Sequence, residues 1–512
     1  MDRLPTRRNV LEAGIGCTAL ATAGCLGAAD GDSETFNMAS TWEIRSLDPV
    51  EGDMTLGQLG VYENLVGVDR EMRVRPELAT DWSVGDDEVT WTFELREDVE
   101  FHDGTAFDAE AAEFSLERAF DESSRLVGLP IASIDATGSY ELEIVTDEPH
   151  SPLPAYLTLR DAAILSPEGV VDGTFEEVSC TGPFTFEEWE PEQSVTISRN
   201  EDYYGAAPSL ETVVYERITD NQTRVLSLQN DEQDVCDLLP ASAVDTLESD
   251  PDVTVDVYDV SAIRFLAFNV AREPFNDVRV RRAVAHAIDA EAIVNDVLEG
   301  VGRPATGPFS PSLTHWANED LEPYAYDLDR AAELLEEAGW DRDGEGRSRD
   351  GEPFEVTLWT YTLRPELELL ADVLQDQLSA VGIDASVRVT EWGALDSAKQ
   401  SGEFDVSLES WSAFWWPDPD RLASFFHSED TLIYTGYEDE TTDELIERGR
   451  TVFDPDEREA VYDEFQERIH ADLPAFTLTY SQYVTGYRNA VQGFVPNPSE
   501  YAHGLENVSI EE

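Results

Sequence analysis

The sequence predicts a protein of the mixed α/β or α+β class, with several sheets and more than one core. Its 512 residues correspond to about three domains at roughly 150 residues each. Apolar and polar residues alternate at 89–95 and 195–198, as in strands with one buried face. Apolar residues recur with helical spacing at 329–339 and 364–382, and both stretches end at glycine. Strands and helices therefore mix throughout the chain.

The N-terminus has the features of an export signal. Arg7 and Arg8 precede a short apolar stretch at 10–24 that ends in small residues. The stretch is too short to cross a bilayer, which takes about 20 apolar residues. A charged start before a brief apolar segment is typical of secretion signals, and paired arginines indicate the route that carries folded proteins.

Cys25 and the residues after it suggest a membrane anchor. Cys25 follows small residues, and 26–34 are small and acidic, which resembles the lipobox and tether of bacterial and archaeal lipoproteins. We therefore expect a twin-arginine lipoprotein signal at 1–24, lipidation of Cys25 and an acidic tether at 25–34. This would hold the protein at the extracellular face of the cell membrane. The alternative is a buried apolar helix in which the cysteine is incidental.

The chain is strongly acidic, with 109 Asp and Glu against 33 Lys and Arg and a net charge of −76. Lys399 is its single lysine. Such a chain repels itself in dilute buffer, whereas about 1 M salt shortens the Debye length to roughly 3 Å, so the composition indicates a hypersaline habitat and a haloarchaeal type of protein. A hydrophobic content of 41% and an aromatic content of 10% exclude an acidic disordered chain. The charge also argues against nucleic acid as a partner.

Eight short blocks follow one another in an order typical of one family. They are SLDP at 46–49, VYENL at 61–65, PELA at 76–79, FELREDVEFHDGT at 93–105, TGPF at 181–184, RNEDYYG at 199–205, PFNDVRVRRA at 274–283 and LLEEAGW at 334–340. Each block alone is weakly specific, but together they cover nearly the whole chain after the leader. The order resembles the oligopeptide, dipeptide and nickel class of extracellular solute-binding proteins of ABC importers, family 5.

The resemblance implies a periplasmic-binding-protein-like fold of the class II type. Two lobes would surround a cleft, with an extra subdomain inserted in the first lobe. Mapped onto this chain, lobe I takes 35–50, 178–268 and 478–512, the inserted subdomain 51–177, and lobe II 269–477. The hinge between the lobes is expected at Thr181, Gly182, Phe268 and Asn269. In this class the lobes close on a solute like jaws.

The resemblance also implies a function. A monomeric binding protein would capture a peptide or a similar small solute in the cleft and deliver it to an ABC permease in the membrane, without catalysis and without a cofactor. An oligosaccharide, another non-peptide solute or a nickel complex, bound by the same mechanism, is the alternative. A secreted hydrolase is a further alternative, but no Gly-x-Ser-x-Gly motif occurs and the seven histidines have no zinc-site spacing.

Two segments are expected to face the ligand. In peptide-binding relatives the first segment lies at the cleft, and here it contains Trp42, Glu43, Ile44 and Arg45. The second runs over 404–419, and its match in those relatives pairs with the main chain of the peptide, a form of strand addition. Its candidate residues are Glu409, Trp411, Ser412, Phe414, Trp415, Trp416 and Asp418.

The second segment departs from the peptide-binding pattern. Those relatives hold the ammonium group of the peptide with an aspartate three residues after the position of Trp411, where this chain has Phe414. Glu409 or Asp418 could substitute for that aspartate. The aromatic residues could instead stack on a sugar or surround an organic cation. The remaining alternative is that they belong to the core.

Tyr361 and Arg364 are two further candidates for the cleft. They follow a predicted strand of lobe II. The alternative is that they form an ordinary loop.

Two features concern possible structural links. Cys180 and Cys236 could form a disulfide outside the cell or remain two buried thiols.

A second set of residues has the spacing of an EF-hand calcium loop, although the residues after it suggest a strand rather than a helix. A solvated hairpin is the alternative to this structural Ca²⁺ site, whose ligands would be Asp341, Asp343, Glu345 and Glu352.

Overall fold

The computed structural model describes residues 35–511 apart from 52–54, 172, 365, 413–416, 430–431 and 500–501. The predicted signal and tether, with Cys25, lie outside the described residues, as do Phe414, Trp415 and Trp416. Within the described ranges, no helix is both long and apolar enough to cross a membrane.

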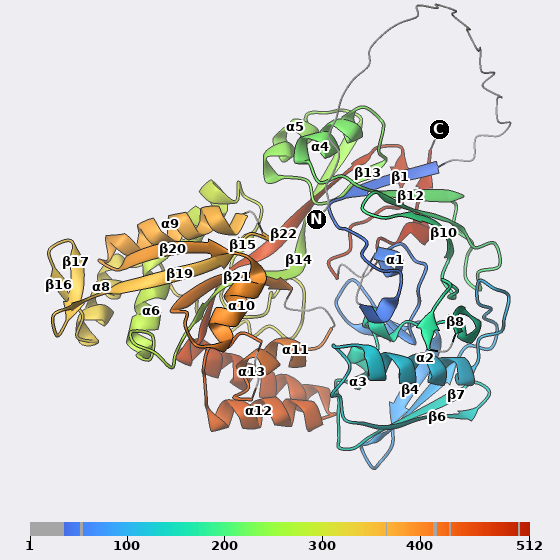
Figure 1. Cartoon of the computed structure of the whole chain (residues 1–512), viewed down its shortest axis with the longest axis horizontal. Helices are drawn as coiled ribbons and strands as arrows, with labels where there is room; N and C mark the ends of the chain where they lie inside the picture. Colours follow the sequence, from blue (N-terminus) through green and yellow to red (C-terminus); the bar gives the residue numbers. More distant parts are fainter. Residues whose placement is uncertain are drawn as a thin grey trace, which may run out of the picture. The chain divides into compact units, whose positions relative to one another are not determined.

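A mixed sheet of eleven strands runs through the described part of the chain (Figure 1). β1 pairs in parallel with β12 and β13, and β19 pairs in parallel with β20 and β21, whereas β22 and β14 pair antiparallel with their neighbours. Because helices and strands share this architecture, the predicted α/β class is confirmed. The strand order is β10 (Phe184–Glu190), β11 (Ser194–Arg199), β12 (Thr212–Arg217), β1 (Thr35–Ser40), β13 (Val235–Cys236), β22 (Ala475–Arg488), β14 (Val253–Phe268), β21 (Val406–Ser412), β19 (Glu355–Tyr361) and β20 (Asp384–Thr390), with β15 (Arg303–Pro304) on β22 beside this path.

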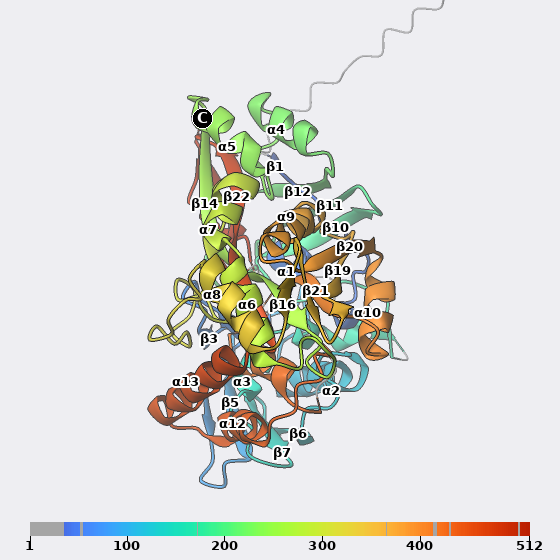
Figure 2. The same ribbon diagram turned by 90° about the vertical axis from the view of Figure 1, so that its left-hand side faces the viewer.

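Two long strands join the two halves of this sheet. β14 and β22 run antiparallel and side by side along most of their length (Figures 1 and 2). Toward one end β22 pairs with β13, and toward the other end β14 pairs with β21. Their register shifts between Asp259 and Ile263, and an irregularity of this kind bends a strand and increases its twist. The chain therefore crosses between the predicted lobes inside these strands.

The predicted hinge residues lie at the end of β14 and shortly before β10. Phe268 ends β14 inside the core on the β19–β21 side, and the side chain of Asn269 donates hydrogen bonds to the loop before β21. Thr181 and Gly182 pack against the segment at 60–63, where the predicted inserted subdomain meets lobe I. Phe268 is thus the last residue of a strand that joins the two halves of the sheet, and the hinge itself stays a prediction. A continuous strand pair can make the connection without a separate hinge loop.

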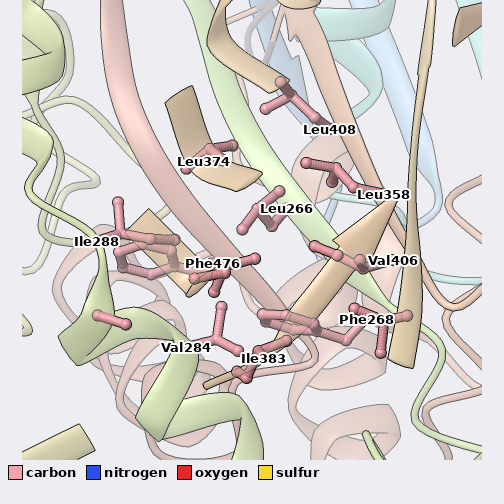
Figure 3. Close-up of a cluster of buried hydrophobic side chains, with 14 of the residues drawn as sticks. Leu266, Phe268, Val284, Ile288, Leu358, Leu374, Ile383, Val406, Leu408 and Phe476 are labelled. Atoms are coloured by element: carbon pink, nitrogen blue, oxygen red, sulfur yellow. The ribbon is translucent and has the colours of Figure 1, made fainter. Parts of the chain in front are cut away.

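Three of the hydrophobic clusters in the described ranges have their centres in different parts of the chain. One packs the β19–β21 side of the sheet against α6 (Val278–Ala287), α8 (Leu328–Glu337) and α9 (Glu366–Ala380), and Figure 3 shows Leu266, Leu358 and Val406 gathered in it. A second packs α2 (Ala109–Glu122) near a separate sheet of β4 (Ala79–Val84), β5 (Thr90–Leu95), β7 (Glu141–Thr146) and β6 (Ile131–Gly138). A third surrounds β1, β11 and β12. Burying each large aliphatic side chain contributes about 1.5–3 kcal/mol. The lobe boundaries themselves stay a prediction.

Several helices begin at aspartates. In each case the aspartate carboxylate accepts a hydrogen bond from a main-chain N–H of the first turn. Such a cap satisfies a donor that the helix leaves unpaired, and it contributes about 1 kcal/mol. Part of the acidic composition therefore serves local folding. The caps are Asp108 of α2, Asp277 of α6, Asp327 of α8, Asp439 of α12 (Glu440–Thr451) and Asp454 of α13 (Pro455–Asp472).

Cys180 and Cys236 are both buried free thiols, which is the second of the two alternatives that the sequence left open. Cys180 belongs to the cluster around β1, β11 and β12, whereas Cys236 packs in a neighbouring cluster with Leu228 and Leu247. Burial raises the pKa of both thiols, that of Cys236 to about 12. Because the thiolate is the reactive species, both side chains are kept in an unreactive form.

The predicted calcium loop is part of a small three-stranded sheet. Its strands are β16 (Asp341–Asp343), β17 (Gly346–Arg349) and β18 (Glu352–Pro353). A calcium loop gathers its carboxylates around one ion, whereas here Asp341 and Asp343 lie on β16, Glu345 in the turn that follows it and Glu352 on β18. No group of three or more His, Cys, Asp or Glu side chains that could hold a metal occurs in the described ranges. The EF-hand hypothesis for Asp341, Asp343, Glu345 and Glu352 is therefore wrong, and the hairpin alternative holds.

A buried carboxyl group lies at the junction of the inserted subdomain and lobe I. Glu63 accepts a hydrogen bond from the hydroxyl of Thr181 at 2.8 Å and from the hydroxyls of Tyr203 and Tyr204 at 2.9 and 2.7 Å. Burial, together with the nearby charge of Glu77, raises the pKa of Glu63 to about 8. The folded protein therefore favours the protonated carboxyl group.

The stability of a Glu63→Gln variant should fall less than that of the wild type as the pH rises from 4.5 to about 8. The pKa of Glu63 is raised by folding, so its stabilising contribution is complete below the ordinary value of 4.5 and is lost as the pH rises through about 8. Each unit of raised pKa is worth about 1.4 kcal/mol, and we expect the wild type to lose at least this much across the window. Denaturant unfolding over this pH range at constant high salt measures the loss.

The matched control for this experiment is Glu94→Gln, which changes an exposed glutamate of β5 in the same subdomain. It should follow the wild-type pH dependence. Equal pH dependence in wild type and Glu63→Gln would contradict the prediction.

Candidate functional site

A cavity lies beside the strand pair β14 and β22. It has a volume of about 20 Å³, far below the range of about 300–1,000 Å³ that is usual for small-molecule sites, and it has room for little more than a water molecule. Distant segments meet in its wall because β13, β22 and β14 are neighbours in the sheet. Its lining includes Trp42 after β1, Asp237 after β13, Tyr258 of β14, Tyr483 and Thr485 of β22, and Phe494 and His503 of the C-terminal segment.

Aromatic side chains form much of this lining. Tyr258 and Tyr483 stand opposite each other in the register of β14 and β22, and their rings meet edge to face with centroids 6.4 Å apart. Phe494 is buried, whereas Trp42 is 39% exposed. A large ring that remains exposed beside a cavity offers apolar surface for a ligand to cover.

One carboxylate lies among these rings. Asp237 accepts hydrogen bonds at Oδ1 from the Thr485 hydroxyl at 2.5 Å, the Leu238 N–H at 2.9 Å and the Tyr258 hydroxyl at 3.4 Å. All three bonds go to the same oxygen, so Oδ2 accepts none from the part of the chain that the structure describes. Burial lowers the pKa of His503 in the same lining, although Asp237 opposes this shift. The imidazole is therefore neutral near neutral pH.

Two of the predicted cleft residues meet each other. The guanidinium carbon of Arg364 lies 5.4 Å from the centroid of the Trp42 ring, within the range of a cation–π interaction. Trp42 follows β1 in the predicted lobe I, whereas Arg364 follows β19 in the predicted lobe II. Burial by itself would lower the pKa of Arg364, but Tyr483 and Glu366 raise it. The contact therefore places a permanent cation between the two predicted lobes.

Trp411 of the second predicted segment belongs to a packed aromatic cluster. The ring of Trp411 lies edge to face with the rings of Trp392 and Phe425, at centroid distances of 5.5 and 5.4 Å. Tyr361 meets Trp392 at 5.0 Å, and the indole N–H of Trp411 donates to Glu409 at 2.9 Å. Trp411 is thus held mainly by protein contacts, as the core alternative expected for this residue.

Two carboxylates that were predicted to substitute for the missing aspartate are engaged in buried ion pairs. The fully buried Glu409 pairs with the ammonium group of Lys399. Asp418 accepts hydrogen bonds from both outer nitrogens of Arg458, at 2.6 and 2.8 Å. A ligand would have to displace these partners, and breaking such a pair costs about 3–5 kcal/mol. The hypothesis that Glu409 or Asp418 holds a ligand is therefore wrong.

Tyr361 and Ile44 serve packing instead of a ligand. The hydroxyl of Tyr361 bonds both main-chain groups of Ser410, at 2.9 and 3.2 Å, and Ile44 is buried in the core of the predicted lobe I. Both predictions assumed that a whole segment faces the cleft. Glu43 and Arg45 remain accessible to solvent, with 3.9 Å between their charged groups.

Sequence reasoning missed Asp237, Tyr258, Tyr483, Thr485 and His503. No motif marks them, because they come from separate segments that only the sheet brings together. One signal was available. Tyr258 stands in the polar phase of the alternating run VTVDVY at 253–258, where a large ring calls for an explanation.

Comparison with known proteins identifies the family. Residues 73–432 match the family described as bacterial extracellular solute-binding proteins, family 5 Middle. The chain belongs to this family. The resemblance carried by the ordered blocks is confirmed, and this family 5 protein is an extracellular or periplasmic solute-binding protein of the kind that serves ABC importers.

Relatives of this family 5 protein match along almost its whole length. The glutathione-binding protein GsiB of Escherichia coli (strain K12) is 28% identical over 470 residues, which cover 88% of this chain and 89% of that protein. The dipeptide-binding protein of the same strain is 26% identical over 518 residues, with 93% and 92% covered. The structure of a nickel ABC transporter from Bacillus halodurans superposes with a TM-score of 0.79 at 29% identity, over 93% of this chain and 99% of that chain. The periplasmic-binding-protein-like fold is therefore confirmed.

Proposed function

We propose that this family 5 protein captures a peptide or a similar small solute between its lobes and delivers it to a membrane permease of an ABC importer, without turnover. The observation that carries the proposal is the contact of Arg364 with the ring of Trp42, two residues that come from the two predicted lobes. The relatives named for glutathione and dipeptides support a peptide-like solute. The relative named for nickel transport supports a nickel complex as the second candidate.

Ligand binding would favour the closed arrangement of the lobes. A solute shifts the balance between open and closed forms only through its preference for one of them. The irregular register between Asp259 and Ile263 marks the part of β14 that is least regularly bound to β22. Bending there would separate Trp42 from Arg364, and a solute between the lobes would hold them together.

A peptide main chain would pair with β21 beyond Ser410. The Thr360 hydroxyl donates to the oxygen of Leu408 at 3.0 Å, and the Tyr361 hydroxyl bonds Ser410, so these main-chain groups are already used. β19 ends at Tyr361. The main-chain groups of every second residue point to the same side of a strand. Leu408 and Ser410 point toward β19, so Ser412 is the first residue of β21 beyond the end of β19 whose main-chain groups could pair with a peptide. The ligand contacts would continue through Phe414, Trp415 and Trp416.

The proposal includes the N-terminal segment. The signal at 1–24 would direct export by the twin-arginine route, and 25–34 would tether the mature protein. Since one acyl chain gives only marginal membrane binding, Cys25 would carry more than one. Such an anchor would keep a monomeric binding protein beside its permease on a cell adapted to high salt.

A bound solute should raise the melting temperature in high salt and be recovered unchanged. Thermal unfolding with small peptides, glutathione and nickel–histidine complexes tests this directly. A ligand present at 100 times its Kd stabilises a folded protein by about 2.7 kcal/mol. Arg364→Ala removes the contact with Trp42, and we expect it to weaken binding by about tenfold, or 1.4 kcal/mol.

The matched control is Arg330→Ala. Arg330 lies on α8 and pairs with Glu333 at 3.0 Å on the surface, so its loss should leave the Kd unchanged. The proposal would be contradicted if none of these solutes stabilised the protein, or if the protein consumed the solute.

A further inference from the structure

A contact apart from the strand pair β14 and β22 joins the predicted inserted subdomain to the predicted lobe II. The Tyr156 hydroxyl, at the end of α3 (Leu153–Tyr156), donates to Oδ2 of Asp420 at 2.7 Å across 264 positions of sequence. Asp420 begins α11 (Asp420–Ala423), and its Oδ1 accepts from Arg450 of α12 at 2.6 Å. In both views of the chain α3 lies close to α12 (Figures 1 and 2). The carboxylate of Asp420 is therefore shared between the two parts of the chain.

A serine next to α3 strengthens this contact. The main-chain N–H of Ser151 donates to the main-chain oxygen of Arg450 at 2.7 Å, and its hydroxyl donates to that of Gly449 at 3.2 Å. Tyr156 and Asp420 are 8% and 1% exposed, so the bonds between them are shielded from water. The subdomain contact is the name used below for this set of residues, Ser151, Tyr156, Asp420, Gly449 and Arg450.

Apolar side chains cross the same boundary in both directions. Phe453, between α12 and α13, packs on the core of the inserted subdomain, where its ring centroid lies 5.8 Å from that of Trp91. Met72 of the inserted subdomain is 1% exposed and belongs to a cluster with Phe425 and Ile446 of the predicted lobe II. The subdomain contact is therefore packed as well as hydrogen-bonded.

The two sides of the subdomain contact are attached to opposite ends of the long strands. The inserted subdomain lies in sequence between β1 and β10, on the side of the sheet where β22 pairs with β13. α11, α12 and α13 lie between β21 and the start of β22, which pairs with the other end of β14. The irregular register between Asp259 and Ile263 lies between these ends. Bending there would therefore pull α3 away from α11 and α12.

We propose that the subdomain contact forms when the lobes close and breaks when they open, so that Ser151, Tyr156 and Asp420 set the balance between the two forms. None of these three is among the residues expected to face the solute. Hydrogen-bonding groups suit a contact that is made and broken, because each can exchange its protein partner for water. The inference rests on the proposed function only for its consequence, which is that a larger closed fraction strengthens solute binding.

The test measures the distance across the subdomain contact. Val127 of the inserted subdomain and Glu444 of α12 are both exposed, so Val127→Cys and Glu444→Cys can carry spin labels, while the two native thiols are buried. Pulsed electron paramagnetic resonance at constant high salt compares Tyr156→Phe and Ser151→Ala with the otherwise unchanged labelled protein. Tyr326→Phe is the matched control, because Tyr326 is 48% exposed and lies outside the subdomain contact. Melting temperatures are recorded for each variant.

Tyr156→Phe keeps the ring and removes the hydroxyl that donates to Asp420. We expect the ratio of closed to open molecules to fall by about tenfold, which appears as longer distances between the labels. Ser151→Ala should shift the distances in the same direction by a smaller amount. Trialanine, glutathione and a nickel–histidine complex serve as binding probes, and the Kd of any that binds should rise by the factor by which the closed fraction falls. Tyr326→Phe should leave the distances and the Kd unchanged.

The inference would be overturned if Tyr156→Phe and Ser151→Ala gave the same distances and the same Kd as Tyr326→Phe. A lower melting temperature with unchanged distances would overturn it as well, because the subdomain contact would then be a permanent part of the fold. In both cases the proposed function would stand. If none of the probes binds, the proposed function fails, whereas the label distances alone still decide whether the subdomain contact opens and closes.

Discussion

Lys399→Met should lower the free energy of unfolding by about 3–5 kcal/mol. Lys399 is the single lysine of the chain and is 2% exposed, and its partner Glu409 is 0% exposed. Glu409 also accepts from the Ser407 hydroxyl at 2.6 Å and from the Trp411 indole at 2.9 Å. Without the ammonium group, these neutral donors would face a buried carboxylate whose charge is uncompensated. Denaturant unfolding at constant high salt measures the loss.

Two further variants separate this cause from a general packing defect. Lys399→Met combined with Glu409→Gln should recover most of the loss, because replacing both partners of a buried ion pair is often close to neutral. Arg448→Met is the matched surface control, since Arg448 pairs with Glu457 at 2.6 Å with both side chains half exposed, and it should cost about 1 kcal/mol or less. Equal losses in Lys399→Met and Arg448→Met would contradict the prediction.

Arg458→Met should also cost about 3–5 kcal/mol. Its guanidinium group bonds Asp418 through both outer nitrogens, at 2.6 and 2.8 Å, and donates to the main-chain oxygen of Gly449 at 2.7 Å. The side chains of Arg458 and Asp418 are only 8% and 5% exposed. Arg458→Lys should recover only part of the stability, because an ammonium group cannot reproduce the two parallel bonds of the guanidinium fork.

The same region ties the predicted inserted subdomain to helices of the second lobe. Asp420, two residues from Asp418, accepts from the Tyr156 hydroxyl at 2.7 Å and from Arg450 at 2.6 Å. Calorimetric unfolding of Arg458→Met should therefore show weaker cooperativity as well as a lower midpoint. Combining Arg458→Met with Asp418→Asn should restore part of the stability. An unfolding midpoint for Arg458→Met equal to that of the wild type would contradict the prediction.

Much of the fold could be predicted from the sequence because its signals are local. The order of the eight blocks indicated the family, and 73–432 match it. Alternation at 89–95 and helical spacing at 329–339 lie in β5 and α8, respectively. Each pattern reflects the burial of one face of a single segment. It can therefore be recognised from residues that are neighbours in the sequence. Trp42 and Arg364, both predicted at the cleft, contact each other, and their role toward a ligand stays a prediction.

The crossing between the lobes could not be predicted in the same way. The crossing was expected near Thr181 and Phe268, but the sequence did not show that β14 and β22 would pair along most of their length. Strand pairing over more than 200 positions of sequence depends on the whole sheet. A local pattern shows that a segment is a strand and does not show which partner lies beside it.

The sequence by itself determined that this is a secreted-type α/β solute-binding protein, and it supplied the carboxylates from which a ligand site could be built. Only the tertiary structure decided which of these carboxylates are already paired. Glu409 and Asp418 form buried ion pairs with Lys399 and Arg458. The physical reason is that the chemistry of a carboxylate depends on the charges and the solvent around it, and folding brings those neighbours from distant parts of the chain.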